Sequence, residues 1–388
     1  MSETGASLRK FVAPEFIFGN GARMLAGQYA RNLGLRHVLL VTGPHLMELP
    51  WPHDVMSSLK KAGVGYTLFS DILPNPRDHQ VMAGAETFRK NGCDALVAVG
   101  GGSPMDCAKA IGIVVTNDRD VLEFEGADNV EIPGPPLICV PTTSGSAADV
   151  SQFSIISDTA RKVKIAIVSK TMIPDVSMID PETTTTKSPE LTAHTGLDAL
   201  THAIEAYVSN AGSPFTDLHA HKAVQLVGQH LLRAINKPDD MEARAGMALA
   251  STHAGLAFSN AILGAVHALA HSLGGYLDLP HGQCNALLLD HVMACNFDNA
   301  ADKYFEIGRL LGAETNDESS YEKRKMTTLD AVASLKRAAG VTQGLAELGV
   351  SSADFEKLAE HALLDPCMLT NPKEICANDI RAILEAAQ

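Results

Sequence analysis

The sequence predicts an α/β N-terminal domain with a parallel sheet over residues 1–185 and an all-α C-terminal domain over residues 186–388. A chain of 388 residues is longer than one compact domain usually is, so two separate hydrophobic cores are expected. Apolar runs alternate with helical patterns in the first half, whereas helical spacing dominates after Thr186. The change of pattern near residue 185 marks the expected boundary.

The alternation in the first half is typical of βαβ units. Strands are expected at short apolar runs, and helices are expected between them. The run Ala95–Val99 is apolar throughout, which suits a parallel sheet covered by helices on both faces. In chain order the expected elements are strand His37–Thr42, helix Asp54–Ala62, strand Tyr66–Phe69, helix Val81–Lys90, strand Ala95–Val99, helix Met105–Val115 and strand Leu137–Val140.

Three further β-like pieces precede the boundary, and the sequence does not determine how they pair. Phe153–Ile156, Lys164–Val168 and Val176–Ile179 either close the sheet or form a hairpin. Ser188 and Pro189 then suit the N-cap and first residue of a helix. The expected later elements are helices at Glu190–Ser209, Thr216–Ile235, Met241–Ser259, Gln283–Asn296, Asp298–Leu311 and Asn378–Gln388, with a surface loop at Glu314–Lys325.

Composition and charge favour a cytoplasmic enzyme. The chain is 46% hydrophobic and 20% charged, as soluble globular proteins are. A formal net charge of −14 disfavours binding to nucleic acid and to anionic membrane surfaces, so neither is an expected partner. Met1–Leu8 lacks an apolar run after a basic start, and no stretch reaches the roughly 20 apolar residues of a membrane span. Seven widely spaced cysteines without a C-x-x-C pair indicate reduced thiols.

A glycine-rich turn follows the expected strand Ala95–Val99. Gly100–Gly102 lets the backbone turn tightly and approach a ligand closely. Ser103 is expected to cap the next helix, with Pro104 at its first position and Asp106 completing a capping box. Backbone amides and the helix dipole would then face the turn, where a pyrophosphate fits. The spacing is not G-x-G-x-x-G, so a plain strand-to-helix connection is the alternative.

A second loop with the same character follows the strand Leu137–Val140. Pro141–Ser146 supplies hydroxyl groups and a glycine at a strand C-terminal end, where open α/β sheets bind ligands. The two loops support one interpretation as a phosphate site. For Thr142 and Thr143, local capping of a turn is the alternative.

Acidic and histidine residues in the second half have the spacing of metal ligands. Asp198 and His202 are four residues apart, so they share one helix face. His267 and His271 repeat this spacing among small apolar residues, where an imidazole needs a partner, and His281 follows in a turn. Imidazoles with one carboxylate suit Fe(II), Zn(II) or Mn(II). His267 and His271 are equivalent candidates on spacing alone, and the competing histidines are His194, His219, His221 and His253.

Together these segments resemble the iron-containing, group III alcohol dehydrogenase family along nearly the whole chain. The resemblance implies a dinucleotide-binding α/β domain and a helical metal-binding domain, in a dehydroquinate synthase-like architecture with the active site between them. It also implies a homodimer or larger homo-oligomer. The segments that carry it are Pro74-Asn75-Pro76, Gly100–Lys109, Pro141–Gly145, Gly196–Tyr207, Gly264–His271 and Pro280-His281-Gly282.

The resemblance also implies individual roles. His271 is expected near the nicotinamide and the substrate, as a catalytic proton relay. The implied metal ligands are Asp198, His202, His267 and His281, which separates His267 from His271. The implied residues that contact or support NAD are Asn75, Gly101, Gly102, Ser103, Asp106, Thr142, Thr143 and Lys164. Asp106 has the capping of its own helix as the alternative.

Three positions depart from the pattern of the family. NAD-specific members usually have an Asp where this chain has Gly43, so no carboxylate excludes the 2′-phosphate of NADP. Ser144–Asp149 replaces the usual Ala-Gly-Thr-Gly-Ser-Glu, which changes the loop beside the pyrophosphate. Ser272 replaces a frequent proline, and Gln283 and Cys284 follow the last ligand, so an atypical substrate preference is expected.

The predicted activity is hydride transfer between a small primary alcohol or diol and a nicotinamide cofactor, with aldehyde reduction as the reverse reaction. Fe²⁺ is the expected metal, with Zn²⁺ as the alternative that the ligand chemistry also permits. The alternative function is that of a zinc-dependent polyol or phosphate-substrate relative, similar to glycerol dehydrogenase or dehydroquinate synthase. A metal- and nucleotide-binding scaffold without catalysis is a third hypothesis.

Overall fold

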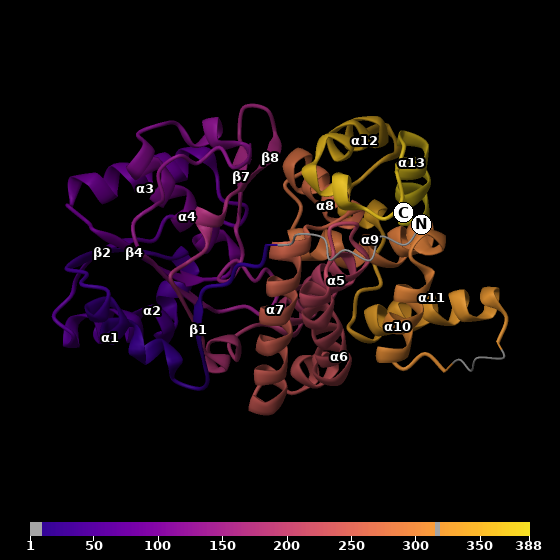
Figure 1. Cartoon of the computed structure of the whole chain (residues 1–388), viewed down its shortest axis with the longest axis horizontal. Coiled ribbons are helices and arrows are strands. Elements are labelled where there is room, and N and C mark those ends of the chain that lie inside the picture. Colours follow the sequence, from indigo (N-terminus) through magenta and orange to yellow (C-terminus); the bar gives the residue numbers. More distant parts are fainter. Residues whose placement is uncertain (1–9, 315–318) are drawn as a thin grey trace.

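The computed structural model describes residues 10–314 and 319–388, and it divides into an N-terminal α/β half and a C-terminal helical half (Figure 1). This is the predicted fold class. The stretch Met1–Leu8, from which no signal sequence is expected, lies outside the described residues. We propose residue 185 as the boundary, in the connection between the short 3₁₀ turn Pro181–Thr184 and α5 (Pro189–Val208).

The N-terminal half is built on a six-stranded sheet in which every pair of neighbouring strands is parallel. Val176–Ile179 pairs with the strand at Leu137–Pro141 and so joins the main sheet, which was one of the two expected outcomes. The strand at Glu15–Phe18 was not predicted. The spatial order is β1 (Glu15–Phe18), β9 (Val176–Ile179), β6 (Leu137–Pro141), β4 (Ala95–Gly100), β2 (His37–Val41) and β3 (Gly65–Phe69).

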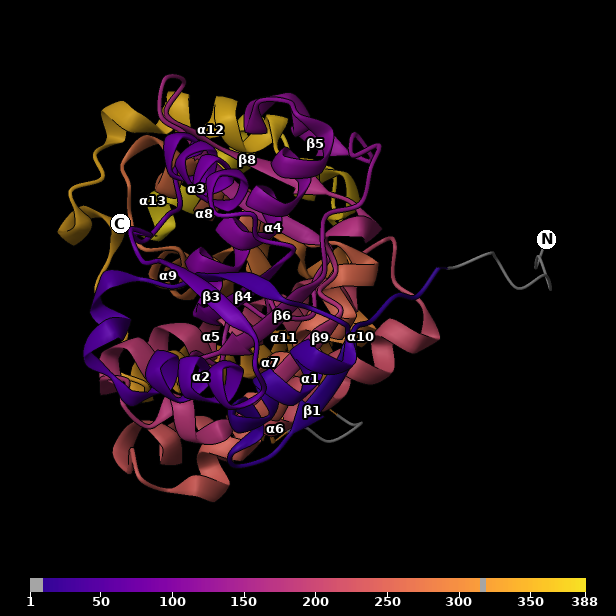
Figure 2. The same cartoon turned by 90° about the vertical axis from the view of Figure 1, so that its left-hand side faces the viewer.

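Helices cover both faces of this sheet, as the apolar strands predict (Figure 2). Successive residues of β2 enter different cores, because side chains alternate along a strand. Val38 and Leu40 pack with Trp51, whereas Leu39 and Val41 lie in the core of the other face. The first face is covered by α1 (Ala26–Asn32) and α2 (Pro50–Lys61), and the second by α3 (Asp78–Lys90) and α4 (Gly102–Asn117).

A smaller sheet lies between the two halves (Figure 1). It has the order β5 (Gly126–Ala127), β8 (Val163–Val168) and β7 (Phe153–Asp158). Strands β7 and β8 are antiparallel, so these two β-like pieces form the hairpin that was the other expected outcome. Strand β8 carries Lys164 and packs against α8 (Ala265–Tyr276) of the helical half.

The helical half begins as expected and then contains more helix than expected. Ser188 accepts a hydrogen bond from the N–H of Leu191, and Pro189 is the first residue of α5. The loop expected at Glu314–Lys325 is wrong from Tyr321 onward, because Ser320 caps a helix there, and residues 315–318 lie outside the described residues. The helices after α5 are α6 (Pro214–Asn236), α7 (Met241–Ala261), α8, α9 (His281–Asn296), α10 (Ala301–Leu310), α11 (Tyr321–Ala338), α12 (Phe355–Leu364) and α13 (Ala377–Ala386).

Among the described helices, none is by itself long and apolar enough to cross a membrane. Helices α7 and α8 meet that criterion only when they are taken as one pair, and the pair is bent by 98°. Each of the seven cysteines has a free thiol, as expected.

Two neighbouring glycines allow β8 to approach α8 closely. A Cβ atom on Gly275 would lie 2.9 Å from the backbone nitrogen of Lys164 and from the Cα of Val163. A Cβ atom on Gly274 would lie 2.7 Å from the Nζ of Lys164, which is the end of a flexible side chain. Only the contact at Gly275 therefore requires the backbone to move.

The variant Gly275→Ala should have an apparent midpoint of thermal unfolding a few degrees below that of Gly274→Ala, since overpacking costs about 1–3 kcal/mol. Gly274→Ala is the matched control, because it gains the same helix propensity of about 1 kcal/mol and meets only a movable amine. Unfolding of the full chain followed by fluorescence at one scan rate measures both. Equal midpoints for the two variants would contradict this account of the packing.

Candidate metal and cofactor site

The structure brings together the four side chains that were expected to hold a metal. One donor atom each from Asp198, His202, His267 and His281 lies within 4.8 Å of every other. Asp198 and His202 face the same way from α5, His267 comes from α8, and His281 is the first residue of α9. All four are buried except His281, whose side chain is 27% exposed.

The imidazoles of the cluster contact one another face to face or at a tilt. The rings of His202 and His267 are stacked with centroids 4.5 Å apart, and those of His267 and His281 are tilted at 5.3 Å. The Nε2 atoms of His267 and His281 lie 3.9 and 3.8 Å from Oδ1 of Asp198. Imidazole nitrogens from α8 and α9 therefore lie close to the carboxylate of Asp198 on α5.

Burial keeps these imidazoles neutral. It lowers the pKa of His202 to about 4 and that of His267 to about 3, although Asp198 opposes the shift in both. Burial, together with the positive charge of Lys164, also puts the pKa of His281 well below its usual value. A neutral imidazole has the free lone pair that a metal ion requires.

The donor set fits a divalent metal ion. The amide nitrogen of Asn285 lies 2.7 Å from Oδ1 of Asp198 and 3.1 Å from Nε2 of both His267 and His281, so hydrogen-bond acceptors surround this point. The Nδ1 atoms of His202 and His281 are buried and have no hydrogen-bond partner within residues 10–314 and 319–388. One carboxylate oxygen and three imidazole nitrogens suit Fe²⁺ or Zn²⁺.

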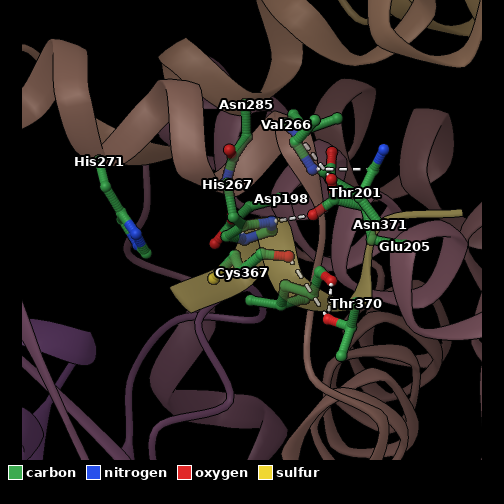
Figure 3. Close-up of polar contacts among 12 residues, drawn as sticks. Asp198, Thr201, Glu205, Val266, His267, His271, Asn285, Cys367, Thr370 and Asn371 are labelled. Carbon is green, nitrogen blue, oxygen red and sulfur yellow. Dashed lines mark hydrogen bonds and ion pairs between the residues drawn. The ribbon is translucent and has the colours of Figure 1, made fainter. Parts of the chain in front are cut away.

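His267 is held from behind by Glu205, which the sequence analysis did not single out (Figure 3). Oε2 of Glu205 lies 2.6 Å from Nδ1 of His267, and Oε1 accepts the backbone N–H of Val266 at 2.6 Å. Burial raises the pKa of Glu205 to about 7, while the surrounding backbone N–H groups oppose this shift. The expectation that a buried imidazole needs a partner is a signal that could have led to this carboxylate.

His271 lies one turn beyond His267 on α8 and outside the group of four donors (Figure 3). Its ring stacks on that of His281 with centroids 5.3 Å apart, so it borders the cluster. Its Nδ1 atom lies 2.8 Å from Oδ2 of Asp365. Burial by itself would raise the pKa of Asp365, but His271 and Cys367 together lower it. The structure thus separates two histidines that spacing alone left equivalent.

The competing histidines have other surroundings. His219 and His253 contact each other, with their Nδ1 atoms 2.9 Å apart. His221 bonds Glu306 through Nε2 at 2.8 Å. None of these three, nor His194, belongs to a cluster of potential metal ligands in the described part of the chain.

The two loops that were expected to bind phosphate lie side by side at one edge of the main sheet. The N–H of Thr142 donates to the carbonyl of Gly100 at 2.8 Å. A Cβ atom on Gly101 would meet Thr143 at 3.2 Å, and one on Gly102 would meet Ser146 at 3.0 Å. The absence of side chains on these glycines leaves the backbone of the turn accessible.

The expected cap at Ser103 is wrong. Helix α4 already begins at Gly102, with Gly101 as its N-cap and without a side chain that caps it. Glycine tolerates the tight backbone path, so the helix starts two residues earlier than the Ser-Pro pattern predicts. The first amides of α4 consequently have no side-chain acceptor, which suits an anionic ligand.

Asp106 does not complete a capping box. Burial raises its pKa to about 6, and its carboxylate accepts the backbone N–H of Ile155, while Lys109 and Lys164 favour the charged form. Its carboxylate therefore connects α4 to the strand β7.

The remaining residues expected at the cofactor differ in accessibility. Thr142 is fully buried and its hydroxyl has no hydrogen-bond partner in the described part of the chain, whereas Thr143 is partly exposed beside a small cavity. Burial lowers the pKa of Lys164, whose amine lies near Gly274 and whose charge acts on His281. Gly43 lies two residues after the end of β2, in an extended conformation.

Asn75 connects the two halves. Its side-chain amide donates to Oδ1 of Asp278 at 2.8 Å, and Arg77 forms an ion pair with Oδ2 of Asp278 at 3.1 Å. Asp278 lies in the turn just before His281, and both Asn75 and Asp278 have positive φ angles, of 54° and 55°. A direct bridge therefore links the α/β half to the turn that carries the last histidine of the cluster.

Comparison with known proteins gives matches along almost the entire chain. Residues 13–181 match the family described as "Iron-containing alcohol dehydrogenase", and residues 192–388 match "Fe-containing alcohol dehydrogenase family, C-terminal". The 1,3-propanediol dehydrogenase of Citrobacter freundii is 40% identical over 372 residues, or 95% of this chain and 96% of that protein. The NAD-dependent methanol dehydrogenase of Bacillus methanolicus is 36% identical over 97% of this chain and 99% of that protein.

The fold has a close counterpart among solved structures. A crystal structure of 1,3-propanediol oxidoreductase gives a TM-score of 0.95 at 38% identity, over 98% of this chain and 100% of the other. Sequence and fold thus agree over the whole length and confirm the resemblance inferred from the motifs. The chain belongs to the iron-containing alcohol dehydrogenase family.

Proposed function

We propose that this protein is a metal-dependent, nicotinamide-linked alcohol dehydrogenase that oxidises small primary alcohols or diols and reduces the corresponding aldehydes. The observation that carries the proposal is the convergence of the donors Asp198, His202, His267 and His281. The helix that carries the first two, α5, is approached closely by the loop after β6, where a Cβ atom on Gly145 would lie 2.7 Å from the carbonyl oxygen of Thr195. The activities printed for the relatives from Citrobacter freundii and Bacillus methanolicus support small alcohols and diols as substrates.

The four donors would hold Fe²⁺, with Zn²⁺ as the alternative. When bound, the metal supplies Lewis acidity to an alcohol oxygen and the nicotinamide accepts the hydride. Asp198 contributes negative charge and the three imidazoles contribute neutral lone pairs, so the set retains a net positive charge with a divalent ion. His271 is the residue we assign to proton transfer, because its ring borders the cluster and imidazole exchanges protons near neutral pH.

The chain's own backbone would bind the cofactor phosphates. Gly101, Gly102 and Ser103 offer the uncapped amides at the start of α4, and Thr143 lies in the adjacent loop. Lys164 faces the region between the loops and the cluster and would contact the nicotinamide side of the cofactor. Supporting positions in this proposal are Gly43, Asn75, Asp106 and Thr142. NAD is the proposed cofactor, and the printed name of the Bacillus methanolicus relative supports it.

We also propose a cytoplasmic homodimer or larger homo-oligomer that binds neither nucleic acid nor membrane. Seven free cysteines suit a reducing compartment, and the net charge of −14 repels anionic surfaces. The edge strand β1 exposes Phe16 and Phe18, which is a surface that assembly would cover. Light scattering of the purified full chain measures the number of subunits.

Replacement of His267 by alanine should remove both the bound metal and the turnover, because the cluster loses one of its four donors. The measurement is metal analysis of anaerobically purified protein, combined with absorbance at 340 nm during oxidation of 1,3-propanediol. His253→Ala is the matched control, since it removes a partly buried histidine outside the cluster. Unchanged metal content in His267→Ala would refute the ligand assignment.

Replacement of His271 by alanine should retain the metal and lower kcat by about 100-fold, which is the usual scale of a lost general acid or base. The same metal analysis and the same assay apply. A variant that loses metal as completely as His267→Ala would show that the proposed separation of roles is wrong.

The variant Gly43→Asp should lower kcat/KM with NADP⁺ at least about tenfold more than with NAD⁺, because the new carboxylate repels the 2′-phosphate. Gly43→Asn is the matched control, with the same shape and no charge. Steady-state rates with both cofactors at one ionic strength give the comparison. If the ratio of kcat/KM with NAD⁺ to kcat/KM with NADP⁺ were the same in the two variants, charge at position 43 would not be the cause of the discrimination between cofactors.

A further inference from the structure

Helix α8 presents two histidines whose rings are both held through Nδ1 by buried carboxylates from distant parts of the chain. Glu205 lies 2.6 Å from Nδ1 of His267 and comes from α5, 62 residues earlier. Asp365 lies 2.8 Å from Nδ1 of His271 and comes from the segment after α12, 94 residues later. The two side chains are 5% and 8% exposed.

The two carboxylates use their oxygen atoms in the same way. Oε1 of Glu205 accepts the N–H of Val266 at 2.6 Å, and Oδ1 of Asp365 accepts the N–H of Cys367 at 2.8 Å. The other oxygen of each is left for an imidazole. The hydrogen bond from the backbone N–H therefore holds each carboxylate in position independently of the imidazole.

An ionised carboxylate can only accept hydrogen bonds, which determines the tautomer of its partner ring. One oxygen of each carboxylate accepts a backbone N–H, from Val266 or from Cys367, and such a hydrogen bond favours the ionised form. Nδ1 of His267 must then carry the hydrogen, and its Nε2 lone pair faces Asp198, 3.9 Å away. By the same logic His271 carries its hydrogen on Nδ1 and keeps a lone pair on Nε2.

We propose that Glu205 and Asp365 are positioning residues, which fix the Nδ1–H tautomers and the ring orientations of His267 and His271. Helix α8 then carries two imidazoles with a free lone pair on Nε2. The lone pair of His267 binds the metal, and that of His271 serves proton transfer. The assignment of these two tasks rests on the proposed function, whereas the tautomers rest on the hydrogen bonds alone.

The variant Glu205→Gln tests the first half of the proposal. A glutamine has one acceptor oxygen, so it can serve His267 or the N–H of Val266 but not both, and its NH₂ group then faces a donor. Affinity for Zn²⁺, measured by competition with a chelator, should fall about 10- to 100-fold. Histidine-selective ¹⁵N spectra of the zinc-loaded protein should lose the Nδ1–H signal of His267, a readout that does not depend on turnover.

The variant Asp365→Asn tests the second half. Zn²⁺ affinity should stay within about twofold of wild type, while kcat falls at least about tenfold with little change in KM and the Nδ1–H signal of His271 is lost. Asp365→Glu, which retains a carboxylate, should recover part of kcat. Glu306→Gln is the matched control, because Glu306 bonds His221 at 2.8 Å outside the site, and it should change none of these quantities.

Wild-type Zn²⁺ affinity and an intact His267 signal in Glu205→Gln would overturn the role of Glu205. Loss of metal in Asp365→Asn equal to that in Glu205→Gln would overturn the separation of the two carboxylates. Should Glu205→Gln fail to fold, Glu205→Asp withdraws the same carboxylate by one methylene and should weaken Zn²⁺ binding. If the wild-type protein turned over no alcohol, the proposed function would fail, and the spectra and affinities would still decide the tautomers.

Discussion

Burial of mutually facing donor atoms is the constraint on which the rest of this structure depends. Asp198, His202 and His267 lie inside a helical bundle, where a polar group without a partner costs several kcal/mol. In this bundle the buried donors are paired with further polar side chains and are not exposed to solvent. Glu205 occupies the far side of His267, and Asn285 contacts three of the four donors. The geometry of the cluster is therefore a property of several helices, and no single helix could support it.

The α/β half contributes through its topology. Because its strands are parallel, the loops after β4 and β6 lie at the same edge of the sheet, and the hairpin of β7 and β8 reaches from there to α8. The glycine turn, Lys164 and the cluster are thereby brought together from three separate regions of the sequence. The helical half supplies the donors of the proposed metal site, and the α/β half supplies the uncapped amides at the start of α4.

The strands that are buried on both faces could be predicted from the sequence by their apolar composition alone. Strands β2, β4 and β6 are covered on both faces and so consist almost wholly of apolar residues. Strand β1 is short and lies at an edge, where Phe16 and Phe18 are exposed, so no such pattern marks it. Helix α11 was missed because only Thr328 and Val332 of its residues are buried, and a mostly polar segment resembles a loop.

The residues of the cluster itself could be proposed from spacing and resemblance, but their supports could not. Asp365 is 94 residues from His271, and no local pattern connects them. Glu205 lies one turn after His202 and could have been suspected, since buried imidazoles elsewhere required an acceptor. The start of α4 was misplaced because a Ser-Pro pair usually opens a helix, whereas the glycines before it permit an earlier beginning.

The bridge from Asn75 and Arg77 to Asp278 has a mechanical consequence for any enzyme built on this frame. Any movement of the two halves apart at this point must either break these contacts or move the turn that carries His281. The position of the last histidine is therefore coupled to the separation of the two halves at this point. This turn is one of several contacts between the two halves, alongside the packing of β8 against α8, so a substitution at Asp278 acts on the junction of the halves and on the cluster together.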